Sequence, residues 1–225
     1  MTKSPNQITG PNAGGPRRSV RSFGVKVSPV RKYLDRLVDR MDLWAFMCNE
    51  VARVDGIGLA DLRRHPASFR ETIKSSLRLI REIDFRRYRR VCREIAWIVN
   101  RVTGSSSGAD YYRSIRTCNI EFTDAVGETQ DIRIAIYACV LIHEATHGAL
   151  DSRGIPYAAY NRVKIERLCV TEQNRFAARL TAIDPERYPE ERLHETFIAG
   201  HWHADWTATP TQRRVSYLSR LFSDR

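Results

Sequence analysis

Cysteine is scarce in this sequence, and the spacing of the few cysteines excludes domains stabilised by a disulfide framework or by a cysteine zinc site. The chain has five cysteines in 225 residues, an odd number, and none of them form a C-x-x-C pair. A disulfide framework or a cysteine zinc site needs paired cysteines at short spacing. We therefore interpret all five as buried thiols in a reducing compartment: Cys48, Cys92, Cys118, Cys139 and Cys169.

The sequence also lacks a long hydrophobic run. Its longest apolar stretch, residues 134–142, is about half the length that a membrane-spanning helix needs. The first 30 residues contain several prolines and glycines, and they lack the apolar segment of a secretory signal peptide. We therefore expect a cytoplasmic protein without a membrane span, in which residues 1–28 form a flexible basic tail.

Acidic residues are missing from the start of the chain, and this makes the charge uneven. The formal net charge is +11; residues 1–32 hold seven basic and no acidic residues, and residues 61–101 hold twelve basic and five acidic ones. Within the second range, residues 86–90 place a tyrosine among four arginines, which suits phosphate contacts and base stacking. This basic half could bind nucleic acid or another anionic partner, or it could be a solvated arginine-rich face.

Only six histidines are present, yet two of them, His143 and His147, form an H-E-x-x-H motif together with Glu144. Residues four apart on a helix lie on one face, so both imidazoles can bind one metal ion. Glu144 is offset toward the open coordination position, where a carboxylate can take a proton from water. The apolar run before the motif predicts a buried helix. The alternative is a pair of core histidines satisfied by hydrogen bonds.

Two histidines leave a zinc site incomplete, and a second predicted helix at residues 161–181 supplies two candidate glutamates. Glu172 falls at the centre of the apolar stripe of this helix, and Glu166 lies at its margin. A carboxylate in a buried stripe needs a cation or a hydrogen-bonded partner. We therefore predict Glu172 as the third ligand. An ion pair between Glu172 and an arginine, and Glu166 as the ligand, remain as alternatives.

Four further residues are candidates for supporting roles at this site. Asp151 lies one helical turn beyond the second histidine, where it could orient that imidazole without touching the metal. Tyr157, in the loop that follows, and His201 or His203 near the C-terminus are candidate donors to the oxyanion of a tetrahedral intermediate. The alternative for each of these three is packing or solvent exposure. Two of the cysteines also fall near the predicted metal, namely Cys139 and Cys169.

The motif followed by a glutamate at this distance resembles the gluzincin group of zincin metallopeptidases. Residues 172–180, Glu-Gln-Asn-Arg-Phe-Ala-Ala-Arg-Leu, are similar to the Glu-Ala-Asn-x-Phe-Ala-Ala-x-Leu stretch of the ImmA/IrrE metallopeptidase family. Gln173 replaces the alanine of that family, and the Leu-x-Pro ending is absent. The resemblance covers residues 90–182 and implies Zn²⁺ as cofactor, a peptide or protein substrate, and an active-site helix packed under a small antiparallel sheet.

Hydrophobic periodicity predicts the rest of the fold. Apolar residues at helical spacing indicate helices at residues 28–54 and 67–82, whose apolar stripes should pack on the core. Residues 90–102 fit a strand or a helix. A strand is favoured, because a loop and an alternating segment at residues 115–123 follow. The edge of such a sheet would be available to pair with an extended peptide.

We therefore expect an α+β, zincin-like fold. Residues 1–28 are the tail, residues 29–88 a helical lobe, and residues 89–225 a zincin-like catalytic domain with a C-terminal cap.

The predicted function is a zinc-dependent peptidase in which His143, His147 and Glu172 hold Zn²⁺ and Glu144 is the general base. The alternative is a basic nucleic-acid- or partner-binding protein whose zinc site is structural or catalytically idle. Glu144 separates the two hypotheses, because a structural site is closed by four protein ligands and does not need that carboxylate.

Overall fold

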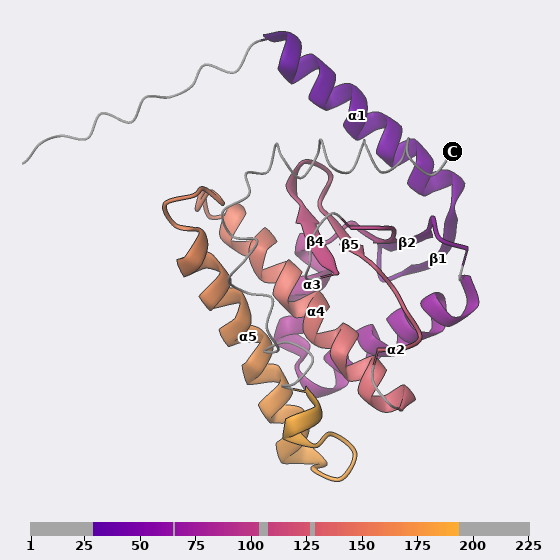
Figure 1. The fold of residues 1–225 in the computed structure, drawn as a ribbon, viewed down its shortest axis with the longest axis vertical. Helices are drawn as coiled ribbons and strands as arrows, with labels where there is room; N and C mark the ends of the chain where they lie inside the picture. Colours follow the sequence, from indigo (N-terminus) through magenta and orange to yellow (C-terminus); the bar gives the residue numbers. More distant parts are fainter. Residues whose placement is uncertain (1–28, 65, 104–107, 127–128, 194–225) are drawn as a thin grey trace, which may run out of the picture.

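The computed structural model describes residues 29–64, 66–103, 108–126 and 129–193, and its centre is a five-stranded sheet surrounded by helices (Figure 1). The elements in chain order are α1 (Pro29–Cys48), β1 (Glu50–Val54), β2 (Ile57–Asp61), α2 (Pro66–Ile83), α3 (Phe85–Glu94), β3 (Trp97–Asn100), β4 (Ala109–Tyr112), the short 3₁₀ helix η1 (Arg113–Ile115), β5 (Thr117–Ile120), α4 (Gln130–Asp151) and α5 (Arg162–Ile183).

The sheet is mixed, with the strand order β1-β2-β3-β5-β4. Strands β2, β3 and β5 run parallel to one another. At the two edges, β1 pairs antiparallel with β2, and β4 pairs antiparallel with β5. The α+β class is confirmed. The prediction of a small antiparallel sheet is wrong for the central strands. Helices α2 and α3 connect β2 to β3 and return the chain to the same end of the sheet, which makes that pair parallel.

The β1–β2 hairpin lies where the sequence predicted the end of a long helix. Asp55 and Gly56 form its two-residue turn, and both have positive φ, at 47° and 88°. Turns of this kind match the twist of the flanking strands, and an Asp-Gly pair is one of their strongest signals. Helix α1 therefore ends at Cys48, and the stretch expected to be a helical lobe contributes two strands, one hydrogen-bonded to β3.

The ambiguous segment at residues 90–102 contains both types of structure. Helix α3 runs to Glu94 and begins at an N-cap, Asp84, whose carboxylate accepts the backbone N–H of Arg87. Strand β3 begins three residues after this helix, at Trp97. The overlapping periodicities in the sequence therefore belong to two consecutive elements.

The two faces of the sheet are covered unequally. Ile57, Leu59 and Ile98 belong to the main core, which α2, α3 and α4 complete. On the opposite face, a smaller cluster places Phe46 of α1 against Trp97, with ring centroids 5.9 Å apart. The central strands β2, β3 and β5 are therefore buried on both sides, which agrees with the mostly apolar sequences of β2 and β3.

Helix α4, which carries the H-E-x-x-H motif, packs against α2, α3, α5 and the edge strand β4 (Figure 1). Its N-cap is Thr129, whose hydroxyl accepts the backbone N–H of Ile132. A glycine permits the close approach of α4 to its neighbours: a Cβ at Gly148 would lie 2.8 Å from the Glu94 Cβ and 2.9 Å from the Tyr111 hydroxyl. No helix in the described part of the chain is long and apolar enough to cross a membrane.

Helix α1 differs most from the sequence-based expectation. Its apolar stripe was expected to pack on the core, yet Trp44 is 67% exposed, and Phe46, which points the other way, is fully buried. The helix therefore contacts the sheet with one narrow side and leaves its broader apolar side uncovered by the described residues.

Candidate metal centre

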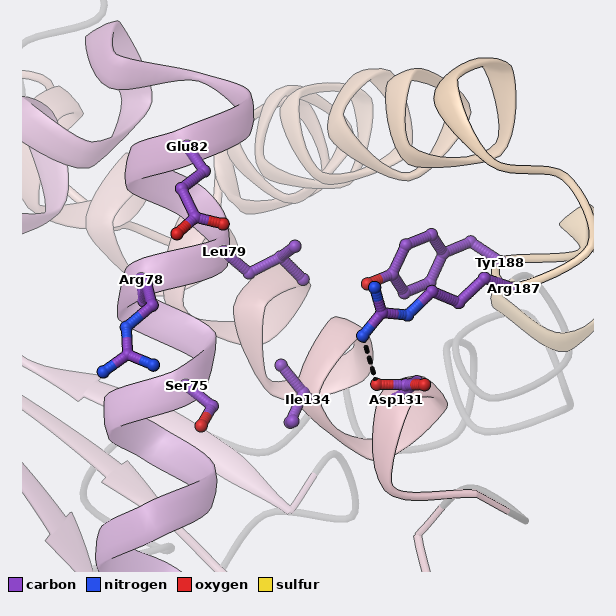
Figure 2. A pocket seen from close by; sticks show the side chains of 8 residues that line it. All are labelled: Ser75, Arg78, Leu79, Glu82, Asp131, Ile134, Arg187 and Tyr188. Atoms are coloured by element: carbon purple, nitrogen blue, oxygen red, sulfur yellow. Dashed lines mark hydrogen bonds and ion pairs between the residues drawn. The ribbon is translucent and has the colours of Figure 1, made fainter.

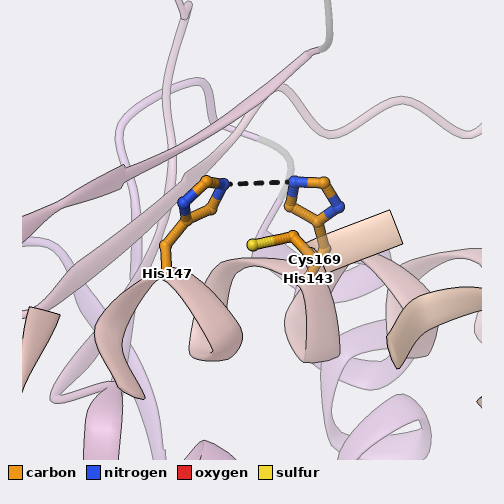
Figure 3. A group of neighbouring side chains, drawn as sticks. All are labelled: His143, His147 and Cys169. Atoms are coloured by element: carbon orange, nitrogen blue, oxygen red, sulfur yellow. Dashed lines mark hydrogen bonds between the residues drawn. The ribbon is translucent and has the colours of Figure 1, made fainter. Parts of the chain in front are cut away.

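The two motif histidines lie on adjacent turns of α4 and face the same way, as their spacing predicts (Figure 3). The Nε2 atoms of His143 and His147 are 3.2 Å apart, and both side chains are mostly buried. Two nitrogen donors so close together inside a protein require a shared cation or a shared proton between them.

A carboxylate from α5 completes the group. Oε2 of Glu166 lies 3.4 Å from Nε2 of His143 and 3.6 Å from Nε2 of His147. In a tetrahedral zinc site with ligand bonds of about 2.0–2.1 Å, neighbouring ligand atoms are about 3.3–3.4 Å apart. The triangle formed by these three atoms is therefore close to one face of a zinc tetrahedron, and the residues present fit this ion.

The structure does not bring Glu172, the glutamate preferred from the sequence, to the histidines. Its Oε2 lies 3.0 Å from Nη1 of Arg90 and 3.3 Å from Nη2 of Arg87, and its Oε1 lies 2.9 Å from Nη1 of Arg175. The stripe-centred position on α5 faces α3, and the arginines of that helix neutralise the partly buried carboxylate. The ion-pair alternative is therefore the one observed, and Glu166, not Glu172, is the glutamate of α5 that lies beside the histidines.

Glu166 is held as a carboxylate by the groups around it. Burial alone would raise its pKa, but the hydrogen bonds and charge interactions with His143 and His147 outweigh burial and hold the pKa well below its usual range. Its second oxygen, Oε1, accepts a hydrogen bond from the Tyr157 hydroxyl, which in turn accepts one from Nε of Arg162 at 3.0 Å. One oxygen thus faces the imidazoles and the other is fixed by the tyrosine.

Gln173 orients the first histidine, a role that was not predicted from the sequence. Its Oε1 lies 3.0 Å from Nδ1 of His143, and its side chain is almost completely buried. An amide oxygen only accepts hydrogen bonds, so this contact favours the tautomer with the proton on Nδ1, which leaves the lone pair of Nε2 for a metal. The sequence contained a signal for this role of Gln173. Glu166 and Gln173 are seven residues apart, which places them on one face of α5.

Cys169 shares that face of α5 and lies beside the histidines (Figure 3). Its sulfur and one ring nitrogen from each of His143 and His147 all lie within 4.8 Å of one another, and these three residues could bind a metal ion. Burial raises the pKa of the thiol, and the nearby carboxylates of Glu144 and Glu166 raise it further. The other cysteine expected near the site, Cys139, belongs to the main core.

Glu144 lies on the side of α4 that faces the edge strand. It is 6% exposed, and burial raises its pKa; the carboxylates of Asp110 and Glu166 act in the same direction, while the two histidines oppose them. Asp110 belongs to β4, and Gly148, one helical turn after Glu144, approaches Tyr111 of the same strand, so the candidate general base is on the side of α4 that faces the edge of the sheet. A carboxyl group in such surroundings is suited to exchanging protons near neutral pH.

The structure separates the remaining candidates. Asp151 does not orient His147 as predicted, because its carboxylate pairs with Nε of Arg113 at 2.7 Å. The ring of His147 instead meets the edge of Tyr157, with centroids 5.3 Å apart. Tyr157 therefore belongs to the site, while His201 and His203 lie outside the described residues.

A cavity of about 210 Å³ lies elsewhere, between α2, the first turns of α4 and the segment after α5 (Figure 2). Its lining includes an ion pair between Asp131 and Arg187, at 2.6 Å, and contains none of the residues of the histidine cluster. The candidate metal centre is therefore not part of this cavity.

Comparisons of the chain with protein-family models, with curated proteins and with solved structures found no match.

Proposed function

We propose that this protein is a zinc-dependent peptidase in which His143, His147 and Glu166 hold the metal and Glu144 is the general base. The observation that carries the proposal is the triangle of two Nε2 atoms and one carboxylate oxygen, with sides of 3.2, 3.4 and 3.6 Å, beside a buried glutamate. A zinc ion bound there would supply the positive charge that polarises a carbonyl group and makes a water molecule more acidic.

Glu144 supplies the proton transfer in this proposal. As a carboxylate it accepts a proton from the attacking water, and as a carboxylic acid it donates that proton to the amine that leaves the cleaved amide. Its burial supports both roles, because a raised pKa makes the two protonation states closer in energy at neutral pH.

Neighbouring residues hold the proposed ligand side chains in position before a metal binds. Gln173 fixes the protonation and ring orientation of His143, while Tyr157 fixes one oxygen of Glu166. Partners of this kind raise metal affinity, because they reduce the number of ligand conformations that binding must select.

The position of strand β4 favours a peptide as the substrate over other molecules that can be hydrolysed. It is an edge strand, paired with β5 on one side and packed against α4, and its Asp110 is close enough to Glu144 for the two carboxylates to interact electrostatically. An extended peptide can add to such an edge through main-chain hydrogen bonds, which would present a backbone amide beside the general base. This arrangement agrees with the resemblance of the motif to gluzincin peptidases.

The position of Cys169 favours a second candidate function. If its sulfur were a fourth ligand, the site would be closed and structural, and the protein would act through its basic half on nucleic acid or another anionic partner. The raised pKa of this thiol opposes that arrangement, because a metal ligand must be a thiolate.

Zinc analysis of purified variants, combined with a peptide-library cleavage assay, tests the proposal. We expect zinc in the wild type, its loss in Glu166→Ala, and its retention in the matched control Glu172→Ala on the same helix. Glu144→Gln should keep the metal and lose cleavage by at least a hundredfold. Full zinc in Glu166→Ala would exclude Glu166 as a ligand. Loss of zinc in Cys169→Ser, with no cleavage by the wild type, would favour the structural site.

A further inference from the structure

Helix α1 is attached to the rest of the molecule by one side only. Phe46 is buried against Trp97, Asp39 accepts a hydrogen bond from the Ser114 hydroxyl at 3.0 Å, and Asp42 lies 3.6 Å from Nη1 of Arg101. Residues 39, 42 and 46 recur at helical spacing, so they define the inner face of α1. This face lies against the sheet surface opposite the main core.

The opposite side of α1 carries a continuous row of exposed apolar residues. They follow one another at alternating intervals of four and three residues: Val30 (66% exposed), Leu34 (52%), Leu37 (44%), Met41 (63%) and Trp44 (67%). Cys48, the last residue of the helix, continues the same series and is also exposed, so the expectation that all five cysteines are buried is wrong for this one. We call these six residues the α1 seam.

Alternating intervals of four and three residues are the spacing of the a and d positions of a coiled coil. An apolar row with this average period of 3.5 residues stays aligned with a second helix along its whole length. Phe46 falls at an f position of the same heptad and points away from the seam, so α1 can contact the sheet and a second helix at the same time. The seam therefore has the pattern of a helix-pairing surface.

The amount of exposed apolar surface is also unusual. Tyr33, Val38 and Met47 flank the seam and are themselves 67%, 45% and 58% exposed, and no described residue covers them. Joining two such faces would remove on the order of 1,000 Å² from water, which is near the lower limit for specific protein–protein interfaces. Isolated monomers rarely leave a patch of this size uncovered.

We propose that the α1 seam pairs with the α1 seam of a second copy of this chain, so that the protein is a dimer. An identical helix presents the same intervals and the same apolar residues, so a two-fold axis makes the surface complementary to itself. The flanking positions bring no like charges together in a parallel pair. Arg40 would lie beside Ala45 of the second copy, and Tyr33 would lie beside Val38 of the second copy.

The proposed dimer does not depend on the proposed zinc chemistry. The seam projects from the sheet face opposite the one that packs on α4, so pairing leaves the histidine cluster uncovered.

Sedimentation equilibrium of the 225-residue protein tests the dimer. We expect a mass twice the 26.0 kDa of one chain in the micromolar concentration range, and a shift to monomer in the double variant Leu37→Glu/Met41→Glu. The matched control is Arg36→Glu, an exposed residue of α1 that lies off the seam and should leave the dimer intact. Circular dichroism should show that all three proteins are folded, because the substituted side chains are exposed.

Cysteine cross-linking gives an independent measurement. In a parallel pair the two Cys48 residues face each other at a positions, and mild oxidation should yield a disulfide-linked dimer that Cys48→Ser abolishes. An antiparallel pair would sediment as a dimer without this cross-link. A wild type that is monomeric at all concentrations, or a dimer that the double variant does not weaken, would overturn the proposal. The first of these results would favour coverage of the seam by the chain's own residues 194–225.

Discussion

Oε1 of Gln173 lies 3.0 Å from Nδ1 of His143, and this contact joins the two helices that form the candidate metal centre. It connects α5 to α4 directly at the first motif histidine and favours the tautomer with the proton on Nδ1. It also gives a reason for a glutamine at a position where the resembling peptidases have alanine.

Replacing Gln173 by leucine should weaken zinc binding about 10–100-fold, because His143 loses the acceptor that holds its ring and its tautomer. Gln173→Glu should retain the affinity of the wild type, since a carboxylate oxygen accepts the same hydrogen bond. Competition with a fluorescent zinc chelator measures both. Equal affinity in the leucine variant and the wild type would show that the contact does not support the metal.

Tyr157→Phe should lower the affinity for zinc by up to about tenfold, because Glu166 loses the hydroxyl that fixes its second oxygen. The ring contact with His147 is retained in this variant. The same chelator competition, followed by measurement of kcat with saturating zinc, separates two roles for the tyrosine. Unchanged affinity with a reduced kcat would indicate the oxyanion role predicted from the sequence instead of the positioning role.

The interaction of Glu172 with its arginines should make stability depend on acidic pH. Burial favours a higher pKa for Glu172, but hydrogen bonds from Arg175 and Arg90 outweigh it and lower the pKa below its usual value. This carboxylate therefore stabilises the fold at pH values above its unfolded-state pKa of about 4.3, and the contribution is lost as the pH falls through the lower folded-state pKa.

Glu172→Gln should accordingly cost about 1–2 kcal/mol in the free energy of unfolding at pH 7, and the difference from the wild type should shrink below about pH 4. Urea unfolding at several pH values gives these free energies. The matched control is Glu71→Gln, whose ion pair with Arg70 is exposed and should contribute less than about 1 kcal/mol. A difference for Glu172→Gln that grows toward acidic pH would contradict the assignment.

Gly148→Ala should destabilise the protein by about 1–3 kcal/mol, because the new Cβ would lie 2.8 Å from the Glu94 Cβ and force α4 away from α3. Since Gly148 follows the second motif histidine directly, the shift should also reduce zinc affinity. Thermal unfolding with and without a chelator measures both effects. An alanine variant as stable as the wild type would show that the helices can separate without cost.

Several features were predictable from local patterns. The four-residue spacing of His143 and His147 within an apolar run was sufficient to predict a buried helix with both imidazoles on one side. The helices at residues 66–83, 130–151 and 162–183 follow from the same periodicity. The hairpin was missed although Asp55-Gly56 is a strong turn signal, because the apolar residues before it continue the helical period.

Other features required knowledge of which elements pack together. The parallel centre of the sheet depends on the path of α2 and α3 between two strands, and no residue in the strands themselves specifies it. The strand β4, which forms the edge beside Glu144, has only four residues, too few for its alternation to be recognised.

The sequence alone determined which side chains share a face of each helix, because that depends only on the α-helical repeat: the histidines on α4, Glu166 with Cys169 and Gln173 on α5, and the apolar row on α1. The tertiary structure decided which neighbour each face meets. Glu172 meets arginines because the side chains of α3 reach its side of α5, and Glu166 meets the imidazoles because α4 packs on the other. A helical period fixes angles around one axis and contains no information about the position of the next axis.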